Sequence, residues 1–325
     1  MSSLSGLIQA TSGYKQLKKD FESGRFNHAY LVSGQDAPFL KHFLRYAAAL
    51  AVCSNGGCLE CSSCRKALKD SHADILVYPR EKEVLRKDEI NEIVSNCFIL
   101  PIESRIKVYS LNVFDKTDPA MQNKLLKTLE EPPENTVFFL GVSNESTVLD
   151  TIKSRCSRIS LDRAEFNSVV SYLVDKGAAQ SEAQIAAIVS FSQPFTAENY
   201  AAGKTFFSMF DDVLDTVKNL SSSREAINAV SRLAEYRERQ AELANMLLAI
   251  FKETLAFSAN PDSLLLTCKK NDIIAITGKF STAALTAAID YINNARTKLE
   301  QRCNFNAVLD WLVLSILEVK HRCPK

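Results

Sequence analysis

The feature that most constrains the fold of this 325-residue chain is the distribution of strand-like and helix-like segments along it. Short runs rich in Val, Ile, Leu, Phe and Tyr concentrate in the first half, and helical patterns separate them. These runs cover residues 28–34, 74–79, 105–111, 136–142 and 157–161. Strands that alternate with helices need crossover connections, which produce a parallel sheet. The first half is therefore predicted to be an α/β domain.

From about residue 163 the pattern is helical throughout. Only three of the ten glycines lie beyond residue 150, and abundant Ala, Leu, Lys and Glu favour helix. Helices are expected at 164–176 and 182–192, the second ending near Pro194, and a helical block from about residue 205 onward. Residues 308–319 are apolar nearly all round, which predicts a deeply buried helix. The fold class is α/β followed by all-α.

The charge balance restricts the possible functions. Lys and Arg number 39 and Asp and Glu 38, giving a net charge of +1, whereas a solitary nucleic-acid binder usually has a clear basic excess. No stretch approaches the ~20 consecutive apolar residues that span a bilayer. The N-terminus has no basic segment followed by an apolar run, so no secretory signal is expected. We expect a cytoplasmic protein with no membrane partner.

Four of the nine cysteines form the pattern Cys53-x4-Cys58-x2-Cys61-x2-Cys64. Four thiolates at these spacings can converge tetrahedrally on Zn²⁺, with Zn–S distances near ~2.3 Å. The two glycines before Cys58 supply the free backbone of a tight ligand loop. Four protein ligands leave no position for substrate, so such a zinc ion would be structural. A redox-active Cys-x-x-Cys pair and four unrelated thiols are the alternatives.

The turn after the first predicted strand lies where a phosphate-binding loop would be. That loop needs the pattern G-x-x-x-x-G-K-[ST], in which backbone amides cradle phosphates. Gly34 matches the first glycine, but Phe39, Leu40 and Lys41 replace the second glycine, the lysine and the hydroxyl. Pro38 also removes a donor N–H. The segment predicts a degenerate loop that binds no nucleotide cofactor, and an ordinary strand-to-helix turn fits equally well.

The third predicted strand runs into Asn112, where a magnesium-organising acidic pair would stand. Asn112 brings no negative charge, and no Glu follows it. Asp115 is interpreted as a loop or cap residue. The sequence therefore predicts no intrinsic ATPase activity.

Two charged features follow further along the chain. Glu130 and Glu131 end a helix before Pro132-Pro133, which is unfavourable for the helix dipole and indicates contacts beyond helix propensity. Arg155, in Ser154-Arg155-Cys156, is by itself most simply a solvated surface charge.

Several of these segments occur in an order that resembles the bacterial clamp-loader family of AAA+ proteins, which serves DNA polymerase III. The segments are His28-Ala29-Tyr30-Leu31, the cysteine cluster, His72-Ala73-Asp74, Lys107-Val108-Tyr109, Leu125-Leu126-Lys127-Thr128-Leu129-Glu130-Glu131-Pro132-Pro133 and Ser154-Arg155-Cys156. The resemblance covers about residues 10–162 and continues weakly at Asn304-Phe305-Asn306 and the last helix. Because motor subunits carry an intact phosphate loop, the substitutions favour the delta-prime branch of the family.

The resemblance implies a division into three domains. Residues 1–162 would form a degenerate AAA+ domain with a zinc module at about 53–64, residues 163–205 a small helical lid, and residues 206–325 a helical oligomerisation collar. Arg155 would be an arginine finger offered to ATP on a neighbouring subunit. It should then lie on an exposed edge and pair with no carboxylate of its own domain.

The implied function is that of a non-hydrolysing stator that helps load the sliding clamp onto primer-template DNA. Its partners would be gamma/tau-type ATPase and delta-type subunits, and the activity of the whole complex would be that of a DNA-directed DNA polymerase. Gln193-Pro194-Phe195 lacks an arginine that active members carry, which also argues against hydrolysis. The alternatives are an active AAA+ motor subunit and a zinc-module protein that binds nucleic acid directly.

Overall fold

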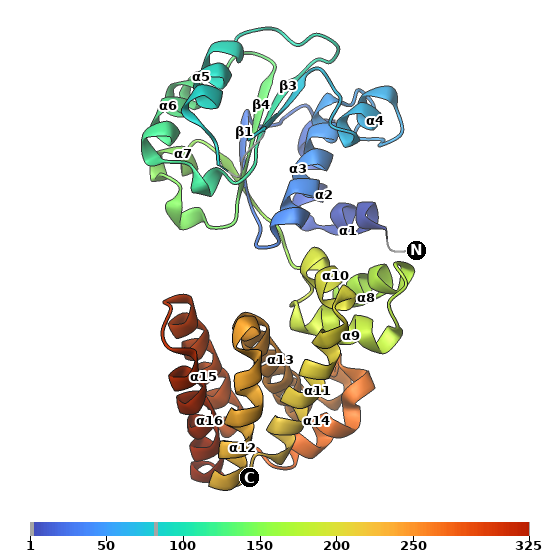
Figure 1. Ribbon diagram of the computed structural model, residues 1–325. Helices are drawn as coiled ribbons and strands as arrows, with labels where there is room; N and C mark the ends of the chain where they lie inside the picture. Colours follow the sequence, from blue (N-terminus) through green and yellow to red (C-terminus); the bar gives the residue numbers. More distant parts are fainter. Residues whose placement is uncertain (1–2, 81–83, 325) are drawn as a thin grey trace. The chain divides into compact units, whose positions relative to one another are not determined.

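The computed structural model describes residues 3–80 and 84–324, which form two compact units. The first unit runs through Ala164, and the second begins at Glu165. Figure 1 shows a sheet flanked by helices in the first unit and only helices in the second.

The first unit contains a five-stranded sheet in the order β2-β3-β4-β1-β5, and all four neighbouring pairs are parallel. The strands are β1 (Ala29–Ser33), β2 (Ile75–Tyr78), β3 (Lys107–Leu111), β4 (Thr136–Val142) and β5 (Ser157–Ser160). Each strand lies within one of the five predicted runs. The predicted α/β class is confirmed.

Helices cover both faces of this sheet. They are α1 (Leu4–Ala10), α2 (Ser12–Glu22), α3 (Ala37–Val52), α4 (Ser62–Leu68), α5 (Lys87–Asn96), α6 (Pro119–Glu130) and α7 (Asp150–Lys153). α3 packs against β3 and β4, with α2 and α4 beside it, and α5, α6 and α7 lie on the opposite face (Figure 1). The central strands β3 and β4 are buried along their whole length, which explains the mostly apolar sequence of β4; β3 also buries Lys107 and Ser110.

The second unit is entirely helical. Its helices are α8 (Phe166–Asp175), α9 (Gln180–Val189), α10 (Pro194–Ala202), α11 (Lys204–Asn219), α12 (Ser223–Leu233), α13 (Gln240–Ala259), α14 (Lys270–Thr277), α15 (Thr282–Glu300) and α16 (Phe305–Arg322). The prediction that helix stops near Pro194 and resumes near residue 205 misses α10. Proline is well accommodated at the first position of a helix, so Pro194 starts a helix as well as following one.

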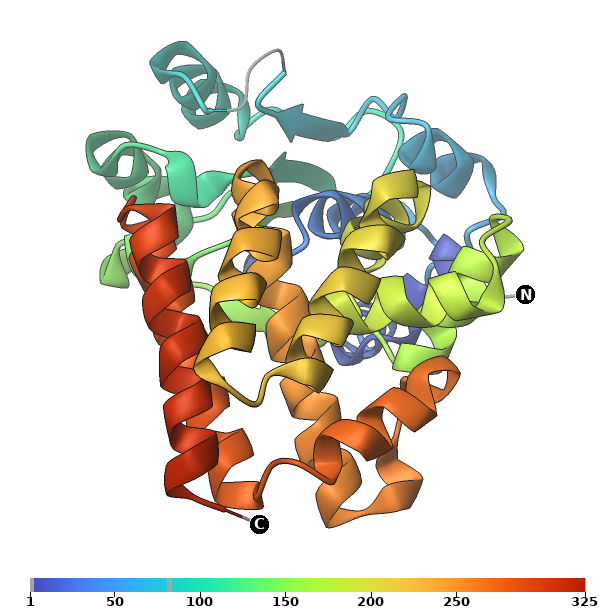
Figure 2. The same cartoon turned by 60° about the horizontal axis from the view of Figure 1, so that its bottom comes forward.

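One hydrophobic core holds the second unit together. It includes Ile185 and Val189 of α9 together with apolar side chains of α11 to α16. α16 packs against α12 and α15, as Figure 2 shows. Leu314 of α16 is nonetheless 53% exposed, so the expectation of a helix buried all round is wrong at this position. The two neighbouring helices leave part of its circumference uncovered. A separate lid ending at residue 205 remains a prediction.

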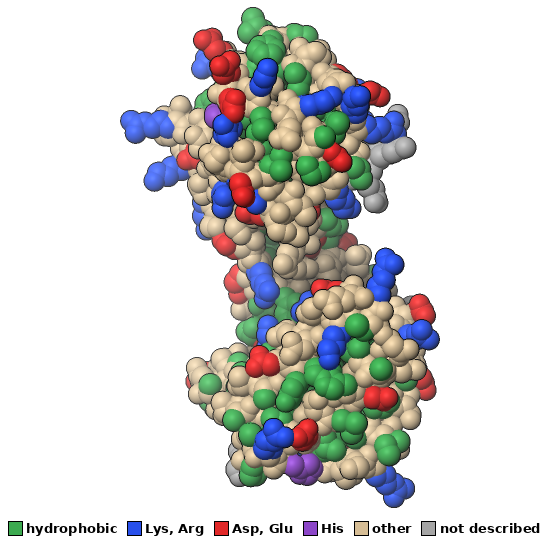
Figure 3. Space-filling view, turned by 90° about the vertical axis from the view of Figure 1, so that its left-hand side faces the viewer, with side chains coloured by type: hydrophobic (Ala, Val, Ile, Leu, Met, Phe, Trp, Pro, Cys, Tyr) green, Lys and Arg blue, Asp and Glu red, His purple; other side chains and the backbone are tan. Residues whose placement is uncertain are grey.

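Apolar side chains also reach the surface of the helical unit. Figure 3 shows them spread among polar groups on one face. The large exposed ones in this unit are Val174, Ile227, Leu265, Ile274 and Leu314. Within the described ranges, no single helix has the length and apolar character to cross a bilayer, although Thr267–Thr277 and Thr282–Glu300, a pair bent by 112°, pass that test together.

Candidate functional site

The four predicted cysteines come together between α3 and α4. Their Sγ atoms all lie within 4.8 Å of one another. Cys53 Sγ is 3.7 Å from Cys58 Sγ and 3.9 Å from Cys61 Sγ. In a tetrahedral site with metal–sulfur bonds of ~2.3 Å, neighbouring sulfurs are about 3.8 Å apart. The cluster, which Cys64 completes, therefore has the dimensions of a four-thiolate metal site.

Local structure explains how the ligand loop closes. Cys53 is the C-cap of α3, Cys61 is the N-cap of α4, and Cys64 lies in the first turn of α4. Between them, Gly57 has a φ of +75°, in the left-handed region that favours glycine. A Cβ atom at Gly57 would lie 2.3 Å from Cδ1 of Leu50. The predicted need for a free backbone before Cys58 is confirmed.

The sulfurs have contrasting environments. Backbone N–H groups of Glu60 and Cys61 lower the pKa of the exposed Cys58 thiol to about 7. Burial raises the pKa of the Cys64 thiol well above its usual value. A cation among the four sulfurs would stabilise the thiolate form even at the buried position, because a coordinated thiol is deprotonated. The donor set thus suits a thiophilic metal ion.

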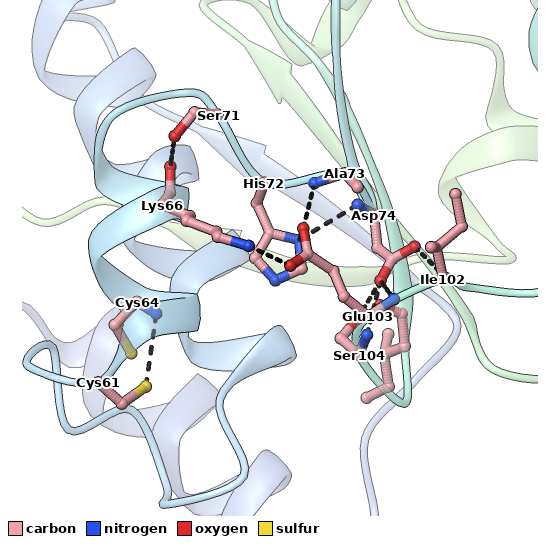
Figure 4. A network of polar contacts seen from close by, with 11 residues as sticks. Cys61, Cys64, Lys66, Ser71, His72, Ala73, Asp74, Ile102, Glu103 and Ser104 are labelled. Carbon is pink, nitrogen blue, oxygen red and sulfur yellow. Dashed lines mark hydrogen bonds and ion pairs between the residues drawn. The ribbon is translucent and has the colours of Figure 1, made fainter.

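Polar contacts connect α4 with the segment that precedes β3 (Figure 4). Lys66 of α4 forms an ion pair with Glu103, whose other carboxylate oxygen accepts the backbone N–H of Ala73 at 2.9 Å. Asp74 is only 1% exposed. Its carboxylate accepts the three backbone N–H groups of residues 102–104 and a hydroxyl of the same segment, at 2.6 to 3.0 Å. Asp74 therefore holds residues 102–104 in place through these hydrogen bonds.

The same hydrogen bonds affect the pKa of Asp74. Burial by itself would raise the pKa of Asp74, but the four donors outweigh it and hold the pKa below its usual value. The backbone N–H of Asp74 donates to Nδ1 of the buried His72 at 3.1 Å. Nε2 of His72 has no hydrogen-bond partner among the described residues. His72-Ala73-Asp74, quoted for the family resemblance, thus has a structural role in this chain.

The loop between α5 and β3, which Asp74 holds in place, carries apolar side chains at the surface. The sequence analysis did not single these residues out. Phe98, Ile99, Leu100 and Ile102 are between 56% and 82% exposed. All four follow the end of α5 at Asn96. Four large apolar side chains exposed within five residues are typical of an interaction surface.

At the position predicted for a degenerate phosphate loop, the chain is already helical. A functional loop would run from residue 34 to residue 39 before its helix starts. Here α3 already begins at Ala37, and Pro38 lies in its first turn. Phe39 and Leu40 are each only 4% exposed. A Cβ atom at Gly34 would lie 3.0 Å from Leu161, so a side chain already covers this glycine.

Asp36 occupies the N-terminus of α3, where a nucleotide phosphate would bind. Its Oδ1 accepts the N–H of Phe39 at 3.1 Å, and the residue is 7% exposed. The N-terminus of a helix attracts an anion, and here the anion is the chain's own carboxylate. A phosphate charge placed ~4 Å from the Asp36 carboxylate would be repelled by about 4 kcal/mol, at the effective dielectric constant near a protein surface. The sequence analysis missed this cap, although an Asp just before a Pro-containing first turn is a typical helix-start signal.

The position predicted for an acidic pair at the end of β3 carries an amide side chain. Asn112 follows β3, and its buried Oδ1 has no hydrogen-bond partner in the part of the chain that the structure describes. Lys41 and Asn112 line the same small pocket beside the Arg45–Asp70 ion pair. The carboxylate of Asp115 accepts the N–H groups of residues 143 and 144 after β4, at 3.1 and 3.2 Å. Asp115 lies in a short 3-10 helix, Phe114–Lys116, and its carboxylate caps the segment after β4.

Arg155 lies between α7 and β5 with one third of its side chain exposed. Its Nη2 is 2.6 Å from Oε1 of Glu130, and its Nη1 donates to the carbonyl of Thr151 at 2.7 Å and to Oγ of Ser154 at 3.3 Å. The expectation that Arg155 pairs with no carboxylate of its own domain is therefore wrong. A charge pair between residues 25 positions apart leaves no local signal in the sequence, although the unfavourable acidic helix end indicated that Glu130 had a partner.

Comparison with known proteins covers the same region. Residues 9–165 match the family model described as "DNA polymerase III, delta subunit". The chain is 22% identical to the delta' subunit of DNA polymerase III from Bacillus subtilis over 320 residues, covering 94% of this chain and 95% of that protein. It is 31% identical to the delta' subunit from Yersinia pestis over 150 residues, covering 44% of each.

The gamma subunit of DNA polymerase III from Buchnera aphidicola subsp. Schizaphis graminum is 29% identical over 163 residues, covering 49% of this chain and 45% of that protein. The chain spans about half the length of the gamma relatives it matches. The residues 9–165 that match the family model contain the parallel sheet, the cysteine cluster and Arg155. Residues 9–165 of this chain are therefore similar to the delta', gamma and tau subunits of DNA polymerase III.

Proposed function

We propose that this protein is a non-hydrolysing stator subunit of the bacterial replicative clamp loader, the assembly that places the sliding clamp on primer-template DNA. The observation that carries the proposal is the filled nucleotide cradle. α3 starts at Ala37, the carboxylate of Asp36 caps it, and Phe39 and Leu40 are buried. A subunit that cannot take up nucleotide keeps one conformation while ATPase subunits move against it.

Reconstitution tests this role. The chain is mixed with gamma/tau-type and delta-type subunits of the same organism, and the complex is sized by light scattering. We expect a stable hetero-oligomer that loads clamps on primed DNA, and slow loading when this chain is left out. A chain that never enters the complex would exclude the stator role.

The division of labour within the chain follows the three domains expected from the sequence. Residues 1–162 would carry the contacts to a neighbouring ATP site, residues 163–205 the lid, and residues 206–325 the collar that joins the subunits. Ile227 of α12 and Leu314 of α16 are 67% and 53% exposed, which leaves apolar area for a collar helix of another subunit. Leu314→Ser should therefore weaken assembly without lowering the thermal stability of the isolated chain.

Arg155 would serve as an arginine finger for ATP on the neighbouring subunit. Its guanidinium is permanently charged and planar, which suits developing phosphate charge. Such fingers are worth roughly 10³–10⁵ in rate at one site, but other sites in the assembly keep working, so Arg155→Ala should lower total ATP turnover by less. Arg155→Lys should rescue poorly because an ammonium lacks the planar fork. Arg158→Ala, an exposed arginine of β5, is the matched control.

The cysteine cluster would hold one structural Zn²⁺ ion. Elemental analysis of protein prepared without added metal should find about one equivalent of zinc, and Cys61→Ser should abolish it. Cys268→Ser, at an exposed cysteine outside the cluster, should retain the metal. Less than about half an equivalent in a folded chain contradicts the four-thiolate site.

A further inference from the structure

The acidic end of α6 is not explained by the helix itself. α6 ends at Glu130, and Glu131 is its C-cap. The C-terminal end of a helix carries partial negative charge, which disfavours carboxylates there. In the described part of the chain, the side chain of Glu131 forms no hydrogen bond or ion pair, whereas Glu130 pairs with Arg155 at 2.6 Å. The two neighbouring glutamates therefore differ in role.

The guanidinium of Arg155 is held from two sides. Glu130 reaches it from α6, and Thr151 and Ser154 reach it from α7 and the residue after α7. A guanidinium has five N–H donors, so three acceptors leave two donors free. Glu130 supplies the one negative charge among these acceptors. When no phosphate is bound, the position of the Arg155 guanidinium thus depends on a single carboxylate, that of Glu130.

We propose that Glu130 is the positioning residue of Arg155, holding the guanidinium against its own domain until a phosphate of the neighbouring subunit's ATP displaces the carboxylate. This inference rests on the proposed role of Arg155 as a finger. A phosphate offers more negative charge and also accepts paired N–H bonds from a guanidinium. It can therefore replace Glu130 at the same nitrogen.

The ion pair between Arg155 and Glu130 is weak enough for a phosphate to displace the carboxylate. The side chains of Arg155 and Glu130 are 33% and 44% exposed, so water and salt screen the pair and keep it weak. Because ATP must displace the carboxylate to reach Arg155, the presence of this pair lowers the affinity for ATP by at most about five-fold, which is about 1 kcal/mol. A buried pair would hold the finger too tightly. This exposed pair orients it and still releases it.

Glu130→Gln tests the proposal because it keeps the shape of the side chain and removes its charge. Steady-state ATP hydrolysis is measured with the complete reconstituted loader and primed DNA over a range of ATP concentrations. We expect the apparent KM for ATP to fall by up to about five-fold, with the maximal rate changed by less than about two-fold. Glu131→Gln removes the same charge one residue away and should leave both parameters unchanged.

The double variant connects the effect to the arginine. In the Arg155→Ala background, Glu130→Gln should have no effect on the apparent KM, because there is no guanidinium left to release. If Glu130→Gln leaves the KM unchanged, raises it, or acts equally without Arg155, while Arg155→Ala still lowers turnover, the positioning role is wrong and the finger stands. If Arg155→Ala itself has no effect on turnover, the finger assignment fails and the positioning role falls with it.

Discussion

Replacing Asp74 by asparagine removes the charge that organises the loop before β3. An asparagine side chain keeps one carbonyl oxygen, which can face the three donors of Glu103 and Ser104. Its NH₂ group then points at the N–H of Ile102, where the native carboxylate accepts a hydrogen bond of 2.6 Å. Hydrogen bonds to charged groups contribute about 1.5–3 kcal/mol each, and a buried donor left unpaired costs about 1–3 kcal/mol. We expect Asp74→Asn to destabilise the loop by about 2–4 kcal/mol.

Hydrogen exchange read by mass spectrometry is the suitable assay, because it reports on the loop itself. A loss of 2 kcal/mol raises the open population of a segment about 30-fold, so exchange at residues 102–104 should accelerate at least that much. Asp150→Asn is the control, since the Asp150 carboxylate is 96% exposed and pairs only with Lys153 among the described residues. The one tryptophan, Trp311, lies in α16 of the helical unit, and its fluorescence should show that this unit unfolds as before.

The same carboxylate predicts a pH dependence. Its pKa in the folded chain is lowered, so its stabilisation is fully present above the unfolded value near 4 and is lost as pH falls through the lower folded value. Exchange at residues 102–104 should therefore become faster relative to the rest of the chain in acid, and Asp74→Asn should lack this dependence. Equal exchange at residues 102–104 in the native and variant chains at neutral pH would refute the stabilising role of Asp74.

Two further predictions concern the cysteine module. Removing the metal with a chelator should accelerate exchange in residues 53–68 and leave α16 protected, because the free energy of metal binding is what folds such a module; unchanged exchange speaks against a structural ion. Gly57→Ala should lower zinc affinity in a competition titration with a chromophoric chelator, since this position needs a positive φ and has no room for a Cβ atom. Gly24→Ala also has a positive φ but meets open space, so it should bind zinc normally, and equal affinities in both variants would contradict the reasoning.

The features that could be predicted from the sequence are those formed by residues that lie close together in the chain. Strands β1, β2 and β4 were recognised because they are short, mostly apolar runs. The cysteine cluster was recognised because its ligands lie within twelve residues and two glycines mark the turn. The lack of an intact phosphate-loop motif was readable because that motif demands particular residues at fixed positions, and Phe39 and Leu40 are incompatible with it.

The features that the sequence did not reveal depend on contacts between distant segments. Asp74 binds a loop 28 to 30 residues further on, and Glu130 binds an arginine 25 residues further on. Neither distance follows from a helical or strand period, so only the packed sheet brings these groups together. α10 was missed for another reason: proline both ends and starts helices, and the pattern around Pro194 fits either reading.

Nucleotide binding by the unmodified, isolated chain tests the central claim most directly. Equilibrium dialysis against labelled ATP with Mg²⁺, followed by a phosphate-release assay on the same sample, measures uptake and turnover together. We predict no saturable binding up to millimolar ATP and no phosphate release above that of a buffer control, because Asp36 and the buried Phe39 and Leu40 fill the cradle. Saturable hydrolysis that co-purifies with the chain at constant specific activity would contradict the account.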